Sequence, residues 1–225
     1  MSKARIATSE TVANDRLKIS EIFYSIQGEA QFSGWPTVFV RLTGCPLRCS
    51  YCDTAYAFSG GEWRTIDEIL TEVAGFDTEY VCVTGGEPLA QPRCLRLAEA
   101  LAERGYRVSL ETSGALDVGA VDARVSRIVD VKTPASGEAA KNRWENLELL
   151  RSSDGLKFVI CNREDFEWAK GVLAEHGALP CPVFFSPSHD ELTPGELADW
   201  ILADRLPVRL QIQLHKALWG NVPGR

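Results

Sequence analysis

The sequence lacks both a cluster of basic residues and a long apolar run. Its 24 lysines and arginines are spread along the chain and are outnumbered by 31 acidic residues, so the net charge is −7. Proteins that bind a nucleic-acid backbone need a clustered basic surface, and we expect no nucleic-acid partner. No stretch approaches the roughly 20 apolar residues of a membrane-spanning helix, and the polar N-terminus lacks the apolar core of a secretory signal. We therefore expect a cytoplasmic protein without a membrane partner.

Histidine is also scarce, with three in the chain, whereas cysteine occurs seven times. An odd number of cysteines without an export signal argues for reduced thiols and against a disulfide framework. Three cysteines lie within eight residues of one another, which indicates metal chemistry. The other four are far apart in the sequence, and we interpret them as small buried apolar residues: Cys82, Cys94, Cys161 and Cys181.

The clustered cysteines, Cys45, Cys49 and Cys52, have the spacing CxxxCxxC. Thiolates at this spacing on a curled loop can bind three irons of a 4Fe-4S cluster and leave the fourth iron open. A structural zinc site and an electron-transfer cluster are the alternatives, but each normally takes four protein ligands. All three histidines lie more than a hundred residues further along the chain, so the open cluster is favoured.

Short runs rich in β-branched and aromatic residues alternate with amphipathic segments. The runs predict strands over residues 18–24, 37–42, 80–84, 107–111, 127–131, 156–160, 183–186 and 208–214. The amphipathic segments predict helices over residues 65–74, 91–104, 143–152, 163–176 and 193–204. Two of these helices have start signals, because Thr65 and Glu68 form a capping-box pair and Thr193 is followed by Pro194.

The alternation of strands and helices predicts an α/β fold with a mainly parallel sheet and right-handed crossovers. A complete eight-unit β/α barrel usually takes about 250 residues, whereas this chain has 225, and only five or six strand–helix units can be counted. We therefore predict a partial, open, TIM-like β/α barrel. Residues 17–225 are expected to form a single domain, preceded by a flexible tail over residues 1–16.

A glycine pair follows the strand predicted at 80–84, at the end of the strand where active-site groups of barrel enzymes collect. Gly85 and Gly86 remove side chains, so that a ligand can approach the backbone, and Glu87 and Pro88 complete a Gly-Gly-Glu-Pro motif. Gly-Gly by itself is also typical of an ordinary turn. The cysteine loop upstream favours the functional interpretation.

Two further strands end in polar residues. Glu111, Thr112 and Ser113 offer short side chains that could hydrogen-bond a ligand, although such a segment also forms helix-capping turns. Asp130 and Lys132 end another strand and would put a cation near the same mouth. The alternative for Lys132 is a solvated surface lysine.

Tyr51 completes a CxxxCxΦC motif, and together with Gly-Gly-Glu-Pro the motif resembles the radical S-adenosylmethionine superfamily. This resemblance implies that S-adenosylmethionine chelates the open iron and that one electron splits its carbon–sulfur bond, giving a 5′-deoxyadenosyl radical. It implies that Glu87 accepts the methionyl ammonium and that Tyr51 lies against the adenine. The implied cofactor-binding residues are Tyr51, Gly85, Gly86, Glu87, Ser113, Asp130, Lys132 and Ser186.

Three other segments are more selective: residues 21–29, residues 39–45 and the Cys-Asp-Thr sequence that begins at Cys52. They resemble the 7-carboxy-7-deazaguanine synthase family, and the likeness runs from about Leu17 to Lys216. It implies a lyase that converts 6-carboxy-5,6,7,8-tetrahydropterin to 7-carboxy-7-deazaguanine and ammonia in queuosine and 7-deazapurine biosynthesis. Hydrogen would be abstracted from the pterin carbon that bears the carboxylate, and S-adenosylmethionine would be regenerated.

The family resemblance also implies six substrate-binding residues. Gln27 offers an amide donor and acceptor for the pterin edge, and the planar fork of Arg41 suits the substrate carboxylate. The alternatives are a surface glutamine, an arginine paired with an acidic neighbour and, for the histidine, a structural role. The implied set is Ile26, Gln27, Gly28, Arg41, Thr84 and His215.

Magnesium is implied in the same way, with Thr54 as its ligand directly after Cys52 and Asp53. Magnesium is a hard cation that keeps several waters and commonly takes only one or two protein oxygens. A single hydroxyl together with substrate oxygens is therefore sufficient. The alternative for Thr54 is a helix N-cap or turn residue.

Two other functions would share part of this pattern. A glycyl-radical-activating enzyme shares the cysteine loop but acts on a protein backbone, and it should lack Gln27 and the Cys-Asp-Thr segment. A non-enzymatic iron–sulfur carrier would need neither the glycine pair nor an open iron. For the favoured enzyme we expect flavodoxin or ferredoxin as electron donor. A homodimer is expected because a partial barrel leaves an open sheet edge.

Overall fold

The computed structural model describes residues 15–220, 222 and 224. Strand β1 begins at Arg16, and most of the predicted tail lies outside the described residues. Nine strands form one sheet in the order β3-β1-β2-β4-β5-β6-β7-β8-β9. The strands are β1 (Arg16–Ile26), β2 (Pro36–Leu42), β3 (Glu62–Thr65), β4 (Tyr80–Gly85), β5 (Arg107–Thr112), β6 (Ser126–Val131), β7 (Gly155–Ile160), β8 (Val183–Pro187) and β9 (Arg209–Leu210).

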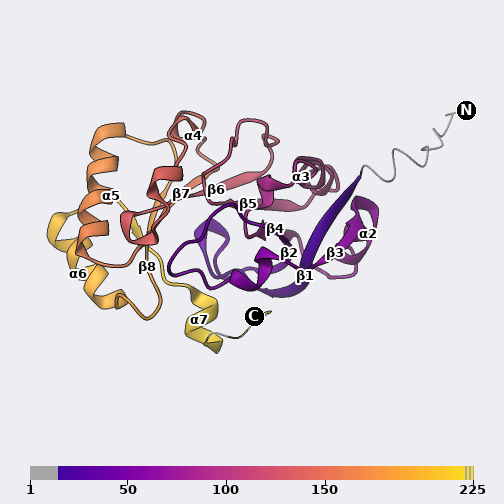
Figure 1. Cartoon of the computed structure of the whole chain (residues 1–225), viewed down its shortest axis with the longest axis horizontal. Coiled ribbons are helices and arrows are strands. Elements are labelled where there is room, and N and C mark those ends of the chain that lie inside the picture. The colour runs from indigo at the N-terminus through magenta and orange to yellow at the C-terminus, as the bar shows by residue number, and fades with distance from the viewer. Residues whose placement is uncertain (1–14, 221, 223, 225) are drawn as a thin grey trace, which may run out of the picture.

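The sheet is mainly parallel and open, as predicted. Strand β1 pairs antiparallel with β2 and with β3, whereas every pairing from β2 through β4 to β9 is parallel. The carboxyl ends of these parallel strands therefore meet at one edge of the sheet. Figure 1 shows the sheet crossing the molecule from β3 on one side to β8 on the other.

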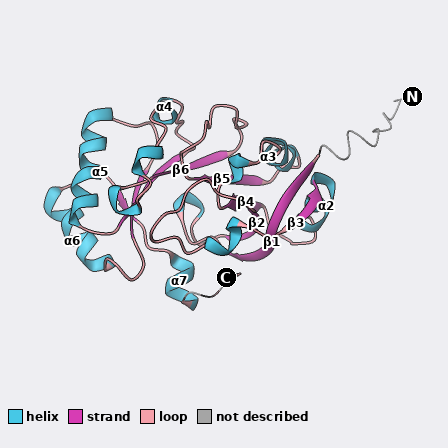
Figure 2. Cartoon of the chain, in the orientation of Figure 1, coloured by secondary structure: helices cyan, strands magenta, loops and turns pink. Residues whose placement is uncertain are grey.

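Helices cover the outer side of this sheet (Figure 2). Helices α5 and α6 lie together beside β7 and β8, and α2 and α3 lie at the opposite end (Figure 1). The predicted caps are present, because Thr65 and Glu68 form both bonds of the capping box and Thr193 accepts from Glu196 N. The helices are α2 (Ile66–Val73), α3 (Cys94–Glu103), α4 (Glu145–Glu148), α5 (Arg163–His176), α6 (Pro194–Asp204) and α7 (Leu214–Trp219).

Two predicted elements were wrong in extent. The helix expected over 143–152 is the single turn α4, because Asp154 turns the chain by accepting hydrogen bonds from Arg127 N and Arg151 N. The strand expected over 208–214 is only the two-residue β9. Beyond it, Gln211 and Gln213 use their side chains to bond other segments, and the helix α7 begins at Leu214.

The apolar core has two large parts, one at each end of the sheet. One joins β1, β2, β4 and β5 to α2 and α3, and the other joins β6, β7 and β8 to α5 and α6. Fully buried side chains such as Phe158, Phe166 and Phe185 each contribute about 1.5–3 kcal/mol to folding. Among the described residues, no helix combines the length and apolarity needed to cross a bilayer. The four isolated cysteines are buried, as predicted, and all seven are free.

Candidate functional site

A cavity of about 410 Å³ lies at the carboxyl ends of the parallel strands. Its wall is built from the loop after β2 and from the ends of β4, β5, β6, β7 and β8, with part of α7 closing one side. All but two of the predicted site residues line it, namely Ile26, Gln27, Arg41, Cys45, Cys49, Tyr51, Cys52, Thr54, Thr84, Gly85, Gly86, Ser113, Asp130, Lys132, Ser186 and His215.

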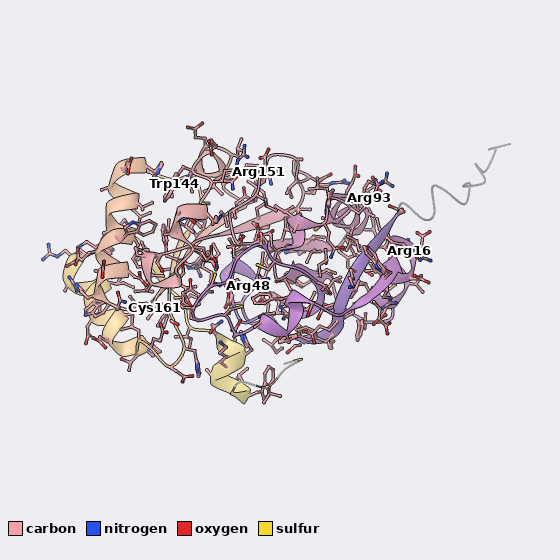
Figure 3. The ribbon with its side chains drawn as sticks, viewed as in Figure 1. Arg16, Arg48, Arg93, Trp144, Arg151 and Cys161 are labelled. Atoms are coloured by element: carbon pink, nitrogen blue, oxygen red, sulfur yellow. The ribbon has the colours of Figure 1, made fainter. Side chains whose placement is uncertain are left out.

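The cysteine loop follows β2 and is held on both sides. Gly44 O accepts from Glu87 N at 2.8 Å, and Ser50 N donates to Ser136 O at 3.0 Å. Leu47, between the first two cysteines, is buried. In Figure 3, Arg48 of this loop lies near the middle of the molecule, between Cys161 and Arg16. The loop therefore has a defined conformation that turns its thiols toward the cavity.

The three half-buried thiols lie on one loop at the cavity and fit a 4Fe-4S cluster. Burial raises the pKa of the Cys45 and Cys49 thiols, so metal binding would have to displace their protons. Within the described residues, no group of three Cys, His, Asp or Glu side chains converges as ligands of one metal ion. A cubane cluster binds each thiolate through a different iron, and separated thiols on one loop meet that requirement.

The glycine pair brings the end of β4 against the cysteine loop. A Cβ atom added to Gly85 would lie 2.5 Å from Leu42 O, and one added to Gly86 would lie 2.6 Å from the Cβ of Cys45. Side-chain carbon atoms essentially never approach so closely. The glycines are thus required for contact between β4 and the loop, whatever ligand also approaches them.

Glu87 is one of the two predicted site residues that do not line the cavity. Its carboxylate is fully buried and accepts hydrogen bonds from Leu89 N at 3.0 Å, Thr112 Oγ1 at 2.9 Å and Ser113 N at 2.7 Å. Ser113 Oγ also donates to it. Through these bonds Glu87 holds Ser113 at the cavity wall.

Gly28 likewise lies behind the cavity wall. Its carbonyl oxygen accepts from Leu214 N at 3.1 Å, and a Cβ atom on Gly28 would lie 2.1 Å from His215 Nδ1. Gly28 therefore makes room for His215, which does line the cavity. Burial lowers the pKa of His215, and its imidazole is neutral at pH 7.

Gln27 lies in the part of the cavity wall that forms the cavity floor, together with Glu29, Glu111, Lys157 and Gln213. Two contacts orient its amide. Its Nε2 donates to Glu111 Oε1 at 3.2 Å, and its Oε1 accepts from Glu29 N at 3.2 Å. Gln27 is buried, so the surface-glutamine alternative does not hold. Burial and the neighbouring Glu29 charge raise the pKa of Glu111, although Lys157 and Arg41 oppose them.

A buried ion pair joins Lys157 to Glu29 beside this floor. Lys157 also lies 3.9 Å from Asp130 Oδ2, and Gln213 Nε2 donates to Glu29 Oε1 at 2.8 Å. Burial alone would raise the pKa of Glu29, but the charge and hydrogen bond of Lys157 lower it overall. Burial would lower the pKa of Lys157, and its acidic neighbours raise it. Both groups are therefore charged at neutral pH.

Arg41 lines the cavity, as a substrate contact would require, and it is also paired with an acidic neighbour. Its Nε donates to Glu21 Oε1 at 2.7 Å, and the Tyr56 hydroxyl donates to the same oxygen at 2.7 Å. The guanidinium also lies over the rings of Phe23 and Tyr56. Arg41 is thus paired with an acidic neighbour and still lines the cavity beside Thr84, its partner in the sheet.

Lys132 is buried, contrary to the surface-lysine alternative. Its Nζ donates to Asp130 Oδ2 at 2.9 Å and lies 6.0 Å from the centroid of the Tyr51 ring. Tyr51 OH and Asp130 Oδ1 are buried without a hydrogen-bond partner among the described residues. Buried polar atoms of this kind require a partner, and these two line a cavity large enough to hold one.

Thr54 ends the cysteine loop without capping a helix. It precedes the short 3₁₀ segment Ala55–Phe58, but its side chain makes no capping bond there. Its Oγ1 instead donates to Asp53 Oδ1 at 2.9 Å, and Lys216 Nζ donates to Asp53 Oδ2 at 2.6 Å. Burial would raise the pKa of Asp53, but these partners lower it to about 2.

Known proteins match this chain over most of its length. A family model described as the radical SAM superfamily matches residues 39–134. The 7-carboxy-7-deazaguanine synthase of Chlorobaculum tepidum is 49% identical over 91% of this chain and 94% of its own length. The 7-carboxy-7-deazaguanine synthase of Koribacter versatilis is 44% identical over 90% of this chain and 97% of its own length. The chain belongs to the 7-carboxy-7-deazaguanine synthase family.

Solved structures agree with this assignment. The crystal structure of QueE from Escherichia coli has a TM-score of 0.74 and 25% identity, covering 88% of this chain and 94% of that one. SuiB from Streptococcus suis, at 12% identity and a TM-score of 0.55, shares the fold. The chain is thus a radical S-adenosylmethionine enzyme of the lyase class, as predicted, and the activating-enzyme and electron-carrier alternatives are not favoured.

The sequence interpretation of this family member missed three polar residues that line the cavity, namely Glu29, Lys157 and Gln213. Glu111 was expected as a possible ligand contact, but its contact with Gln27 was not. Glu29 lies inside a motif that was noted for other residues. Lys157 carried a signal of its own, because a charged residue in the middle of an otherwise apolar strand needs a partner when it is buried.

Proposed function

We propose that this chain converts 6-carboxy-5,6,7,8-tetrahydropterin to 7-carboxy-7-deazaguanine and ammonia, within queuosine and 7-deazapurine biosynthesis. One observation carries the proposal: a single cavity contains the three cysteines, the oriented amide of Gln27 and the guanidinium of Arg41. The loop that would hold a radical-generating cluster and the side chains that could bind a polar, carboxylate-bearing heterocycle thus line the same cavity.

The cofactors fit the residues present. Cys45, Cys49 and Cys52 would hold the 4Fe-4S cluster, and together with S-adenosylmethionine it supplies a carbon radical that abstracts hydrogen. The backbone at Gly85 and Gly86 lies next to the loop, where the methionyl group would bind. Other contacts to the cofactor would come from Tyr51, Ser113, Asp130, Lys132 and Ser186.

The polar side chains of the cavity floor would hydrogen-bond the edge of the pterin. The contact with Glu111 and the backbone contact at Glu29 fix which end of the Gln27 amide donates and which accepts. The Glu111 carboxyl group adds a further polar group beside the Gln27 amide. Ile26 would add an apolar contact beside this edge. A heterocycle with alternating donors and acceptors is complementary to this row of groups.

The substrate carboxylate would bind Arg41 and a magnesium ion. Glu21 engages Nε of Arg41, which leaves the outer edge of the guanidinium fork for a carboxylate. Thr54 donates its proton to Asp53, so the lone pairs of its oxygen remain for Mg²⁺. Thr84 and the neutral His215 would complete the contacts to substrate.

An electron donor and an assembly complete the proposal. A flavodoxin or ferredoxin would reduce the cluster, and two chains would form a homodimer. The sheet supports the homodimer because exposed apolar side chains lie on its short edge strand β9 and on the segment after it, and an uncovered edge favours pairing. These side chains are Leu210, Ile212 and Leu218.

The proposal is tested by anaerobic turnover. The reconstituted and reduced enzyme is mixed with S-adenosylmethionine, Mg²⁺ and 6-carboxy-tetrahydropterin, and 7-carboxy-7-deazaguanine is followed by mass spectrometry. Product is expected from the wild type and from Cys181→Ala, whose buried thiol is remote from the loop in sequence. Cys49→Ala should form none, because the cluster loses one of three ligands.

The outcome that would overturn the substrate is equally specific. If 5′-deoxyadenosine accumulates while no deazaguanine forms from an enzyme with full cluster content, the pterin is not the substrate. Product from Cys49→Ala at the wild-type rate would refute the role of the loop.

A further inference from the structure

Three polar side chains connect the C-terminal helix α7 to the segment after the last cysteine. Lys216 Nζ donates to one oxygen of Asp53 at 2.6 Å, and Thr54 Oγ1 donates to the other at 2.9 Å. All three residues line the cavity. Both oxygens of the Asp53 carboxylate are therefore engaged, one by an ammonium and one by a hydroxyl group.

The ammonium of Lys216 is a fixed part of the cavity wall. The Lys216 side chain is only 8% exposed, whereas that of Asp53 is 37% exposed. The segment that carries Lys216 is tied to the β1 side of the cavity, because Leu214 N donates to Gly28 O and Gln213 Nε2 donates to Glu29 Oε1. A lysine held in this way stays beside Asp53 when the cavity contains no ligand.

Asp53 would otherwise be an attractive ligand for a divalent cation at Thr54. Magnesium and manganese prefer carboxylate oxygens, and adjacent Asp and Thr side chains could supply two ligands together. The ammonium group occupies Oδ2 and repels an approaching dication at close range. The ion pair thus lowers the affinity of the empty cavity for metal.

We propose that Lys216 is a positioning residue that withholds Asp53 from the metal, so that Mg²⁺ binds well only after the substrate has supplied its own oxygens. The inference rests on the proposed magnesium site at Thr54. Thr54 and the substrate carboxylate would then hold the metal together, and the empty cavity would hold no metal in a position that blocks substrate. Binding is ordered, with substrate before metal.

Mn²⁺ is a direct probe, because its free form is counted by electron paramagnetic resonance. The reconstituted enzyme with S-adenosylmethionine and without pterin is titrated with Mn²⁺. Lys216→Met should bind Mn²⁺ about tenfold more tightly than the wild type, since a repelling charge is removed and a carboxylate oxygen is released. Lys216→Arg keeps the ion pair and should behave as the wild type does. Adding pterin should tighten Mn²⁺ binding strongly in the wild type and only slightly in Lys216→Met.

The double variant Asp53→Asn with Lys216→Met separates this role from a structural one. It should return to the weak affinity of the wild type, because the released carboxylate is absent. The inference is overturned if Lys216→Met binds Mn²⁺ no more tightly than the wild type, or if the double variant keeps the gain. Should Lys216→Met not fold, Lys216→Gln gives the same test with an uncharged donor.

The outcome of the Lys216 test can be distinguished from the outcome of the turnover test of the proposed function. Wild-type turnover that depends on Mg²⁺, together with unchanged Mn²⁺ affinity in Lys216→Met, would refute the role of Lys216 and retain the reaction. Tighter Mn²⁺ binding in Lys216→Met, together with a wild type that forms no deazaguanine, would support the role of Lys216 and refute the reaction.

Discussion

At the scale of single residues, the cavity floor depends on charges that are removed from water in matched pairs. The Lys157 and Glu29 side chains are about nine-tenths buried, and Gln213 supplies a further hydrogen bond to Glu29. A buried pair contributes little net stability compared with apolar packing, but removing one partner leaves an uncompensated charge. The pair therefore fixes the position of Glu29, whose backbone amide orients Gln27.

Lys157→Met should lower the free energy of unfolding by about 3–5 kcal/mol, because Glu29 is left buried and unpaired. Without Lys157, burial raises the pKa of Glu29 above its unfolded value. The loss should thus be smaller at about pH 5, where Glu29 can protonate, and larger at about pH 8. Urea denaturation at the two pH values measures both effects.

Two controls make this prediction specific. Lys170→Met removes partly exposed ion pairs that join Lys170 of α5 to Glu167 of α5 and to Asp204 of α6, and should cost less than about 1 kcal/mol. The double variant Lys157→Met with Glu29→Gln should recover much of the loss. A double variant as unstable as Lys157→Met alone would show that the lysine stabilises the fold by some route other than Glu29.

At the scale of elements, the contact between β4 and the cysteine loop decides whether three thiols can hold a cluster. The end of β4 is hydrogen-bonded to the loop through Gly86 N and Leu42 O and through Glu87 N and Gly44 O. Buried Glu87 then links the same turn to Ser113 at the end of β5. Three loops at the strand ends thus share one set of contacts.

Gly86→Ala should displace the loop, because the added carbon would lie 2.6 Å from the Cβ of Cys45. We expect the iron content after reconstitution to fall by at least about half, with little change in overall fold. Gly171→Ala on α5 is the matched control, since its added carbon meets nothing within 4 Å and a helix interior favours alanine. Iron and sulfide analysis compares the two, and full cluster content in Gly86→Ala would refute the contact's role.

The extents of some strands were predicted well from the sequence, and those of others were not. Parallel strands covered on both faces read as short apolar runs, so β4 through β8 were predicted to within about two residues. Strand β3 is a polar, exposed edge strand and gave no such signal. The segment 208–214 looked like a strand, but its glutamines bond distant groups and α7 follows, which no local pattern reveals.

The candidate site likewise contains some residues that the sequence predicted and others that it did not. Residues inside tight motifs were placed in the cavity, because spacing along one loop constrains them. Glu87 and Gly28 belong to such motifs, yet their roles depend on neighbours that folding brings from β5 and α7. Lys157 reaches Glu29 across more than a hundred residues of sequence, and only the register of the sheet determines that contact.

At the scale of the whole molecule, an open sheet gathers the polar ends of its parallel strands at one edge. The antiparallel strands β1 and β3 extend the sheet on one side, and α7, which lies below the middle of the molecule in Figure 1, closes part of the cavity. The two apolar cores lie at opposite ends of the sheet. Chemistry that requires water to be kept from a reactive intermediate is thereby confined to one half-enclosed space.

The central claim is that this cavity directs radical chemistry at the pterin carbon that bears the carboxylate. The most direct measurement is anaerobic turnover with 6-carboxy-tetrahydropterin deuterated at that carbon, followed by mass spectrometry of the recovered S-adenosylmethionine. The account predicts that deuterium appears in S-adenosylmethionine as 7-carboxy-7-deazaguanine forms. Product formation with no deuterium in S-adenosylmethionine or in 5′-deoxyadenosine would contradict it.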